Sequence, residues 1–177
     1  MDVSWQKLLL FGAVVVFVGF LLWKYRPGWP MVRPLRRPAP ADKRPWADIE
    51  GEVREAREEA RRATTPRERA AALVRAADMA ARADHGVASM GLYIRAMRAD
   101  ATFDDPIRGI ADLLRKDRPE LLETVLWRRL AHLQWSGETA PAAKCAAEAL
   151  AGLYRHELRQ RDRARALRKL ASVIGVG

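Results

Sequence analysis

An uninterrupted run of apolar residues near the amino terminus constrains this chain more than any other feature. From Leu8 to Trp23 no residue carries a polar side chain. As a helix rising about 1.5 Å per residue, the segment from Trp5 to Tyr25 would measure roughly 30 Å, the thickness of a bilayer's hydrocarbon core. Its terminal tryptophans and tyrosine are residues that favour the headgroup level of a membrane. We therefore predict that residues 1–25 form a transmembrane anchor.

Basic residues are distributed unevenly around this segment. Lys7 alone precedes it, whereas seven follow it before residue 45: Lys24, Arg26, Arg33, Arg36, Arg37, Lys43 and Arg44. Lysine and arginine accumulate on the cytoplasmic side of a membrane helix. We therefore expect a single-pass protein of a bacterial-type inner membrane with a cytoplasmic carboxy-terminal domain. The opposite orientation, with that domain facing the periplasm, remains an alternative.

The side chains expected at the membrane interface belong to the two ends of the anchor and to the linker that follows it. They are Trp5, Trp23, Lys24, Tyr25, Arg26, Arg33, Arg36 and Arg37. Residues 26–45 hold six of the chain's ten prolines, which exclude a regular helix and favour an extended linker. The linker's cations would either attract anionic headgroups or only enforce the orientation. Gly12 and Gly19 share one helix face and could admit a neighbouring transmembrane helix.

The composition changes after residue 46, where Ala, Arg, Leu and Glu dominate and no apolar alternation with period two persists. This pattern indicates an all-α domain over residues 46–177. Thr65, Pro66 and Glu68 have the spacing of a capping box and mark the start of a helix. Apolar spacing predicts seven helices, at about 46–63, 65–83, 87–100, a short one after Pro106, 117–136, 139–158 and 159–174.

Small and aromatic residues recur across two of the predicted helix pairs. In the second and third helices they are Leu73, Ala76, Ala77, Ser89, Tyr93 and Ala96, and in the fifth and sixth they are Trp127, Leu130, Ala131, Gly137, Ala142, Ala146, Ala149 and Leu150. Their spacing resembles that of the tetratricopeptide repeat over about half of the domain. The resemblance implies antiparallel helix pairs in a bundle or short solenoid. The two pairs are not separated by a multiple of the usual repeat length, so a regular superhelix is not expected. An unrelated alanine-rich bundle is the alternative.

In tetratricopeptide proteins the first helix of each pair lines a groove that holds a peptide or partner helix. The resemblance therefore implies a partner-binding groove lined by Arg75, Asp78, Arg128, Arg129, His132 and Trp135. The spacing of Arg128, His132 and Trp135 independently supports these three residues as a binding site, because they would share one face of a continuous helix. Such a face could hold an acidic, partly apolar segment of a partner. Alternatively, Trp135 packs at a helix end while Arg128 and His132 are solvated.

The remaining motifs give no reason to expect a metal, a cofactor or catalysis. His85, His132 and His156 have no cysteine or second histidine at metal-ligand spacing, and phosphate-binding glycine loops and nucleophile elbows are missing from the sequence. The net charge of +10 favours contact with anionic lipid, nucleic acid or an acidic protein surface. Nucleic acid is not expected, since no aromatic residue interleaves the arginines of the last predicted helix. That helix is predicted to cap the sixth, and the alternative is that its arginines contact an anionic membrane or nucleic acid.

Together these observations predict a membrane-anchored scaffold or protein–protein interaction module without enzymatic activity. Anchoring would raise the concentration of the helical domain near a partner without new contacts. Two alternatives remain: an accessory structural subunit of a larger membrane complex, and a periplasm-facing assembly factor. The expected partners are a protein with acidic segments, anionic lipid headgroups and a neighbouring transmembrane helix.

Overall fold

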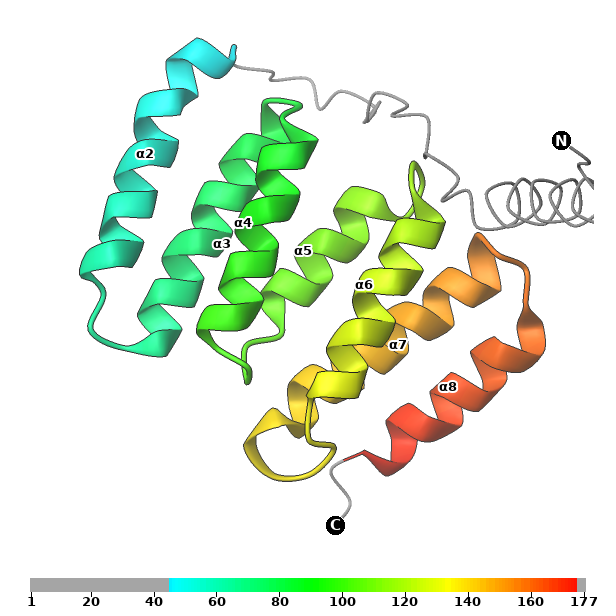
Figure 1. Cartoon of the computed structure of the whole chain (residues 1–177). Helices are drawn as coiled ribbons and strands as arrows, with labels where there is room; N and C mark the ends of the chain where they lie inside the picture. The colour runs from blue at the N-terminus through cyan, green and yellow to red at the C-terminus, as the bar shows by residue number, and fades with distance from the viewer. Residues whose placement is uncertain (1–44, 175–177) are drawn as a thin grey trace, which may run out of the picture. The chain divides into compact units, whose positions relative to one another are not determined.

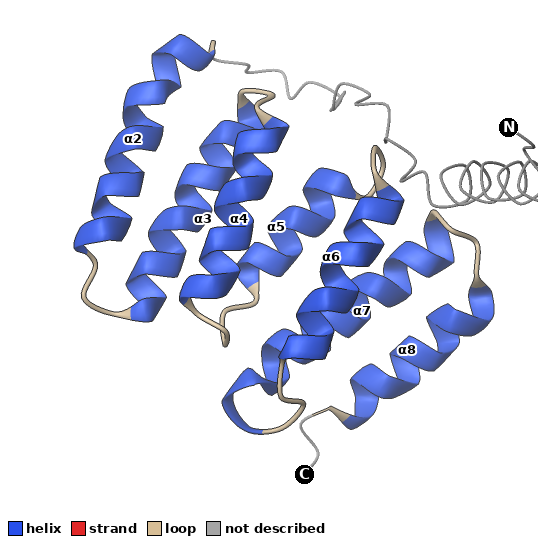
Figure 2. Cartoon of the chain, viewed as in Figure 1, coloured by secondary structure: helices blue, strands red, loops and turns tan. Residues whose placement is uncertain are grey.

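The computed structural model describes residues 45–174, which form seven α-helices, one short 3-10 helix and no strand (Figures 1 and 2). The helices are α2 (Trp46–Arg62), α3 (Pro66–Arg82), α4 (Gly86–Ala99), α5 (Asp105–Leu114), α6 (Pro119–His132), α7 (Ala140–His156) and α8 (Arg161–Val173), and the 3-10 helix is Gly137–Thr139. The predicted all-α class is thus confirmed for this range. None of these helices combines the length and apolar character needed to cross a bilayer, and the predicted anchor, linker and membrane-interface residues lie outside the described range.

The helices alternate between two sides of an array. Each helix packs on the next one along the chain, and α5 also contacts both α3 and α7, which lie two helices before and after it in the chain. In Figure 1, α4 and α6 lie in front of α3 and α7. The short α5 lies at the centre, where it contacts α3, α4, α6 and α7. Consequently α2 lies at one end of the array and α8 at the other.

The start of α3 is set by the predicted capping box. The Thr65 hydroxyl accepts a hydrogen bond of 3.2 Å from the Glu68 backbone N–H, and the Glu68 carboxylate accepts one of 3.2 Å from the Thr65 backbone N–H. The bond from the Thr65 backbone, followed by those of the Thr65 and Thr64 side chains, lowers the pKa of Glu68. Since the folded pKa lies below the ordinary one, this stabilisation is present at neutral pH and is lost as the pH falls through the lowered value.

Thr65→Ala is expected to lower the free energy of unfolding by about 1 kcal/mol, because it leaves a backbone N–H of the first turn without its acceptor. Thermal melts followed by circular dichroism measure the effect. Thr124→Ala is the matched control, because the hydroxyl of this exposed threonine bonds only a carbonyl within its own helix. Equal melting temperatures for the two variants would contradict a stabilising cap at Thr65.

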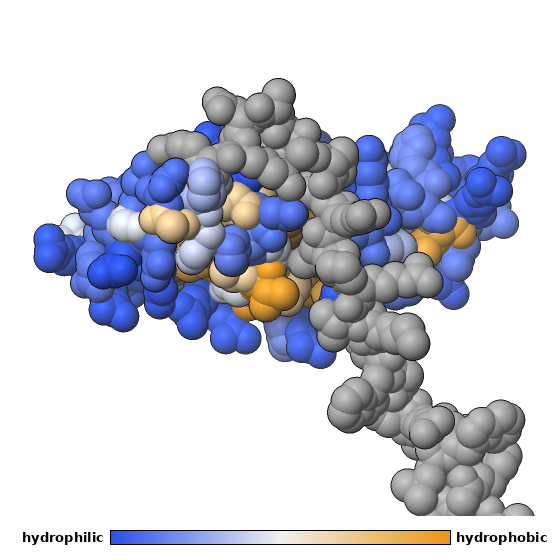
Figure 3. Space-filling view, turned by 90° about the horizontal axis from the view of Figure 1, so that it is seen from above, coloured by the Kyte–Doolittle hydropathy of each residue, from blue (hydrophilic) through white to orange (hydrophobic). Residues whose placement is uncertain are grey.

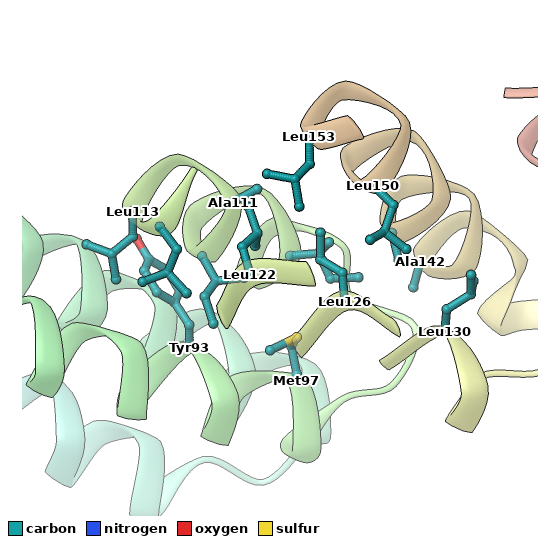
Figure 4. Packing of buried hydrophobic residues seen from close by; sticks show 14 of the residues in the cluster. Tyr93, Met97, Ala111, Leu113, Leu122, Leu126, Leu130, Ala142, Leu150 and Leu153 are labelled. Carbon is teal, nitrogen blue, oxygen red and sulfur yellow. The ribbon is translucent and has the colours of Figure 1, made fainter. Parts of the chain in front are cut away.

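The core is built from leucines of α6 enclosed by neighbouring helices. Leu122, Leu126 and Leu130 recur every four residues and are fully buried. Figure 4 shows their side chains gathered between α5 and α7, near Ala111 and Leu150. Alanines supply much of the buried surface of α3 and α7. Such small side chains let helix backbones approach closely, which is why an alanine-rich sequence packs as layers of helices.

Tyr93 packs directly against the backbone of a neighbouring helix. Its ring lies over Gly109 of α5, where an added Cβ atom would overlap the ring. The Tyr93 hydroxyl donates a hydrogen bond to the Asp78 carboxylate of α3, and only 2% of the residue is exposed. Tyr93 therefore connects α3, α4 and α5 and requires a residue without a side chain at position 109.

The end of α6 differs from the sequence-based prediction. The apolar pattern predicts a helix to about Ser136, but α6 ends at His132 because Leu133 is extended, with φ −92° and ψ 142°. The Leu130 carbonyl, which continued helix would have paired with a backbone N–H, accepts a 3.1 Å hydrogen bond from the Trp135 indole instead. Trp135 thus follows the helix rather than belonging to it.

Candidate partner-binding surface

The solvent-facing side of α6 carries two tryptophans. We define the α6 face as the following set of exposed residues: Thr124, Trp127, Arg128, Ala131, His132 and, just beyond the helix, Trp135. Trp127 is 41% exposed and Trp135 is 47% exposed. Seen from above, the described surface is mostly hydrophilic with small hydrophobic areas (Figure 3). Among the described residues, the large apolar side chains that are exposed are Val87, Trp127, Trp135 and Val173, so two of the four lie on the α6 face.

Both indole rings are held in place by hydrogen bonds from their N–H groups. Trp127 donates to the hydroxyl of Tyr154 on α7 over 3.0 Å, and Trp135 donates to the Leu130 carbonyl. Tyr154 is itself buried, and its hydroxyl donates to the Glu123 carboxylate of α6. Rings fixed before binding lose little conformational freedom when a partner covers them, which favours affinity.

A groove between α6 and α8 continues the α6 face. Its volume is about 450 Å³, and its lining is Glu123, Trp127, Tyr154, Arg163, Ala166, Leu167 and Leu170. The Arg163 guanidinium lies 5.6 Å from the centre of the Tyr154 ring and 4.0 Å from the Glu123 carboxylate. The apolar wall formed by α8 offers a place for an aliphatic side chain of a partner next to Trp127.

Three of the predicted binding residues make contacts within the domain instead of facing a shared groove. Arg75 forms a 2.5 Å ion pair with Glu59 of α2, and Asp78 accepts the hydrogen bond from Tyr93. Both lie on α3, which has no contact with α6. The structure therefore does not bring them together with Arg128, His132 and Trp135.

Arg129, the third of these residues, joins α6 to the connection between α4 and α5. Its guanidinium donates a 2.9 Å hydrogen bond to the Ala101 carbonyl. Burial lowers the pKa of Arg129, while the charge of Asp100 acts in the opposite direction. Phe103 belongs to the same connection, and the centre of its ring lies 3.7 Å from the guanidinium of Arg67 on α3. Arg129 is thus a structural contact and not part of the α6 face.

Sequence reasoning missed Trp127 as a binding residue and used it only as a repeat position. The sequence nevertheless contained the necessary spacing. Trp127 and Ala131 are four residues apart, and so are Arg128 and His132, which each follow one of them directly. All four residues therefore share one side of a helix. The hydrogen bond to Tyr154 was not visible in the sequence, since Tyr154 is 27 residues away along the chain.

Within residues 45–174 no three histidine, cysteine or acidic residues gather as a metal site would require. Cys145 is partly buried, and burial raises the pKa of its thiol, which makes it a weak nucleophile at neutral pH. Comparisons with models of protein families, with curated proteins and with solved structures give no match to this chain. The functional argument therefore depends on the α6 face itself.

Proposed function

We propose that this chain is a membrane-anchored, non-catalytic interaction module that binds a protein partner through the α6 face. The observation that carries the proposal is the pair of half-exposed tryptophans, each fixed by an indole hydrogen bond. Tryptophan and arginine are enriched among the residues that dominate binding energy at protein interfaces. Arg128 and His132 beside them favour an acidic, partly apolar segment in the partner.

The proposed membrane anchor is residues 1–25, and the proposed orientation places the helical domain in the cytoplasm. The apolar run from Leu8 to Trp23 and the excess of cations after it support both parts of this proposal. The tetratricopeptide resemblance is consistent with the alternating arrangement of α3, α5 and α7. In this view the helical array displays the α6 face to partners at the inner surface of a membrane.

A photo-cross-linking amino acid at position 131 of the full chain tests the proposal in intact cells. Ala131 is exposed and is four residues from each tryptophan along the chain, so the reactive group would lie against a partner bound to the α6 face. We expect a discrete cross-linked protein, identified by mass spectrometry. The same amino acid at position 98, where Arg98 is exposed on α4, is the matched control and should not capture that protein.

The same cells test the orientation. Protease added outside intact cells should leave residues 46–177 uncut and should digest them in inverted vesicles. Digestion in intact cells would contradict the cytoplasmic placement and favour the periplasm-facing assembly factor. Equal cross-linking of the same protein at positions 98 and 131 would contradict binding through the α6 face. Cross-linking to neighbouring proteins from most exposed positions of the domain would favour the accessory subunit of a larger complex.

A further inference from the structure

A second groove lies between α7 and α8, on the side of α8 away from the α6 face. It consists of two adjoining hollows of about 490 and 460 Å³ that share Arg155, His156 and Arg168. We call it the basic groove and define it by its lining: Lys144, Glu148, Ala151, Gly152, Arg155, His156, Arg161, Ala164, Arg165, Arg168, Ala171 and Ser172. Alanines and a glycine are interspersed among its larger charged side chains. The alanines are buried at its floor, whereas Gly152 is partly exposed and would let another helix approach α7 closely.

The charged side chains of the basic groove are nearly all cations. Five lysines and arginines line it, and Glu148 is the one carboxylate among the lining residues. Across residues 45–174, the one ion pair made by these cations joins Arg165 to Asp162 over 3.6 Å, and both side chains are largely exposed. The other four cations have no carboxylate within the described structure that pairs with them. The groove therefore favours an acidic occupant.

The position of the groove in the array favours a helix as that occupant. α7 contacts both α5 and α6, the two helices that precede it. A helix in the basic groove would contact α7 and α8 in the same way and would continue the alternating arrangement by one more element.

At the opposite end of the array, α2 presents a row of carboxylates. Asp48, Glu52, Glu55 and Glu59 follow one another at steps of four, three and four residues and are all exposed, so they share one side of the helix. They lie beside the buried stripe of Ile49, Val53, Ala56 and Ala60. Glu59 pairs with Arg75. One side of α2 is thus acidic, although Arg54 and Arg57 lie on its other side, and the basic groove at the opposite end of the array is cationic.

We propose that the basic groove binds the acidic side of α2 from a second copy of this chain. One surface of each copy then meets a different surface of the next, so the contact is head-to-tail and can extend into chains. Confinement to a membrane would favour such chains by raising the local concentration. This contact uses neither Trp127 nor Trp135, and it leaves the α6 face available for a different protein.

Sedimentation velocity of the full chain in detergent micelles tests this contact. We expect the sedimenting mass to rise with protein concentration at about 50 mM salt and to fall back at about 500 mM, because salt screens exposed charges. Two charge-reversed proteins are compared: Arg165→Glu with Arg168→Glu, and Asp48→Arg with Glu55→Arg. Each alone should associate at least about tenfold more weakly than the unaltered chain. An equimolar mixture should associate again, because each reversed surface finds its complement on the other protein.

A steric variant gives an independent test. A Cβ atom added at Gly152 meets no atom within 4 Å, so Gly152→Leu should fold normally and yet obstruct the basic groove. Association should be lost. The matched control is Gly91→Leu, which adds the same side chain to the groove between α2 and α4, where a Cβ atom also meets nothing within 4 Å. This control should associate like the unaltered chain.

Several results would overturn the inference. Association that is absent at low salt, or that survives both charge reversals, would show that α2 does not occupy the basic groove. A mixture of the two reversed proteins that stays dissociated would do the same. If the Arg165 and Arg168 reversals reduced only flotation with anionic lipid vesicles, the groove would be a lipid site instead. Cross-linking at position 131 should be unaffected by these variants, so the proposed function and this inference can fail separately.

Discussion

Gly109→Ala is expected to destabilise the helical domain by about 2 kcal/mol, although alanine is ordinarily the better helix former. The new methyl group would overlap the Tyr93 ring. That ring cannot move away freely, because it is buried and its hydroxyl bonds Asp78 on a third helix. Denaturant unfolding followed by circular dichroism measures the loss, and the midpoint should fall without a change in slope.

The matched control is Gly51→Ala on α2. A Cβ atom at Gly51 meets nothing within 4 Å, so alanine there should stabilise the protein by about 0.5–1 kcal/mol through its helix propensity alone. The two substitutions are chemically identical and should therefore act in opposite directions. If Gly109→Ala unfolds at the same or a higher denaturant concentration than the unaltered chain, Tyr93 does not pack over α5 in this way.

Trp135→Ala is expected to weaken binding of the protein captured at position 131 by about 2 kcal/mol, roughly thirtyfold. The substitution removes a large aromatic surface that is 47% exposed and already fixed by its bond to Leu130. Arg128→Glu should weaken binding further if the partner is acidic, because it replaces attraction with repulsion. Titration of the full chain in detergent with the purified partner measures both effects.

Loss of folding would mimic loss of binding, since Trp135 also pairs with the last turn of α6. Thermal melts of each variant must therefore accompany the titration. Arg98→Glu is the charge-matched control, because Arg98 is exposed on α4 and lies outside the α6 face. An Arg128→Glu protein that melts normally and binds like the Arg98→Glu protein would exclude the α6 face as the binding surface.

The helical class and the order of the helices could be predicted from the sequence because their causes are local. A capping box depends on residues three positions apart, and Thr65 and Glu68 form the one expected at the start of α3. The buried stripe of α2, from Ile49 to Ala60, follows from the helical period alone. The last helix also docks on α7 as its apolar spacing predicts. The anchor and its orientation stay predictions.

The end of α6 could not be predicted in this way, because two effects compete there. Apolar spacing continues through Leu133, but the chain leaves the helix and the Trp135 indole takes the released Leu130 carbonyl. Because α6 ends at His132, Trp135 does not continue the helical face that Arg128 and His132 share. Local pattern thus placed Arg128, His132 and Trp135 together but missed Trp127, whereas the terminal hydrogen bond decided how Trp135 is presented.

What the sequence by itself determined was which segments are helical and which side of each is apolar, since both follow from contacts within a few residues. The tertiary structure decided which helices meet. It placed α3 apart from α6, so that Arg75 and Asp78 do not join Arg128, and it assigned Arg129 to the Ala101 carbonyl. It also arranged the cations of α7 and α8 around one groove. These pairings depend on the packing of side chains far apart in the chain, for which helical periodicity carries no information.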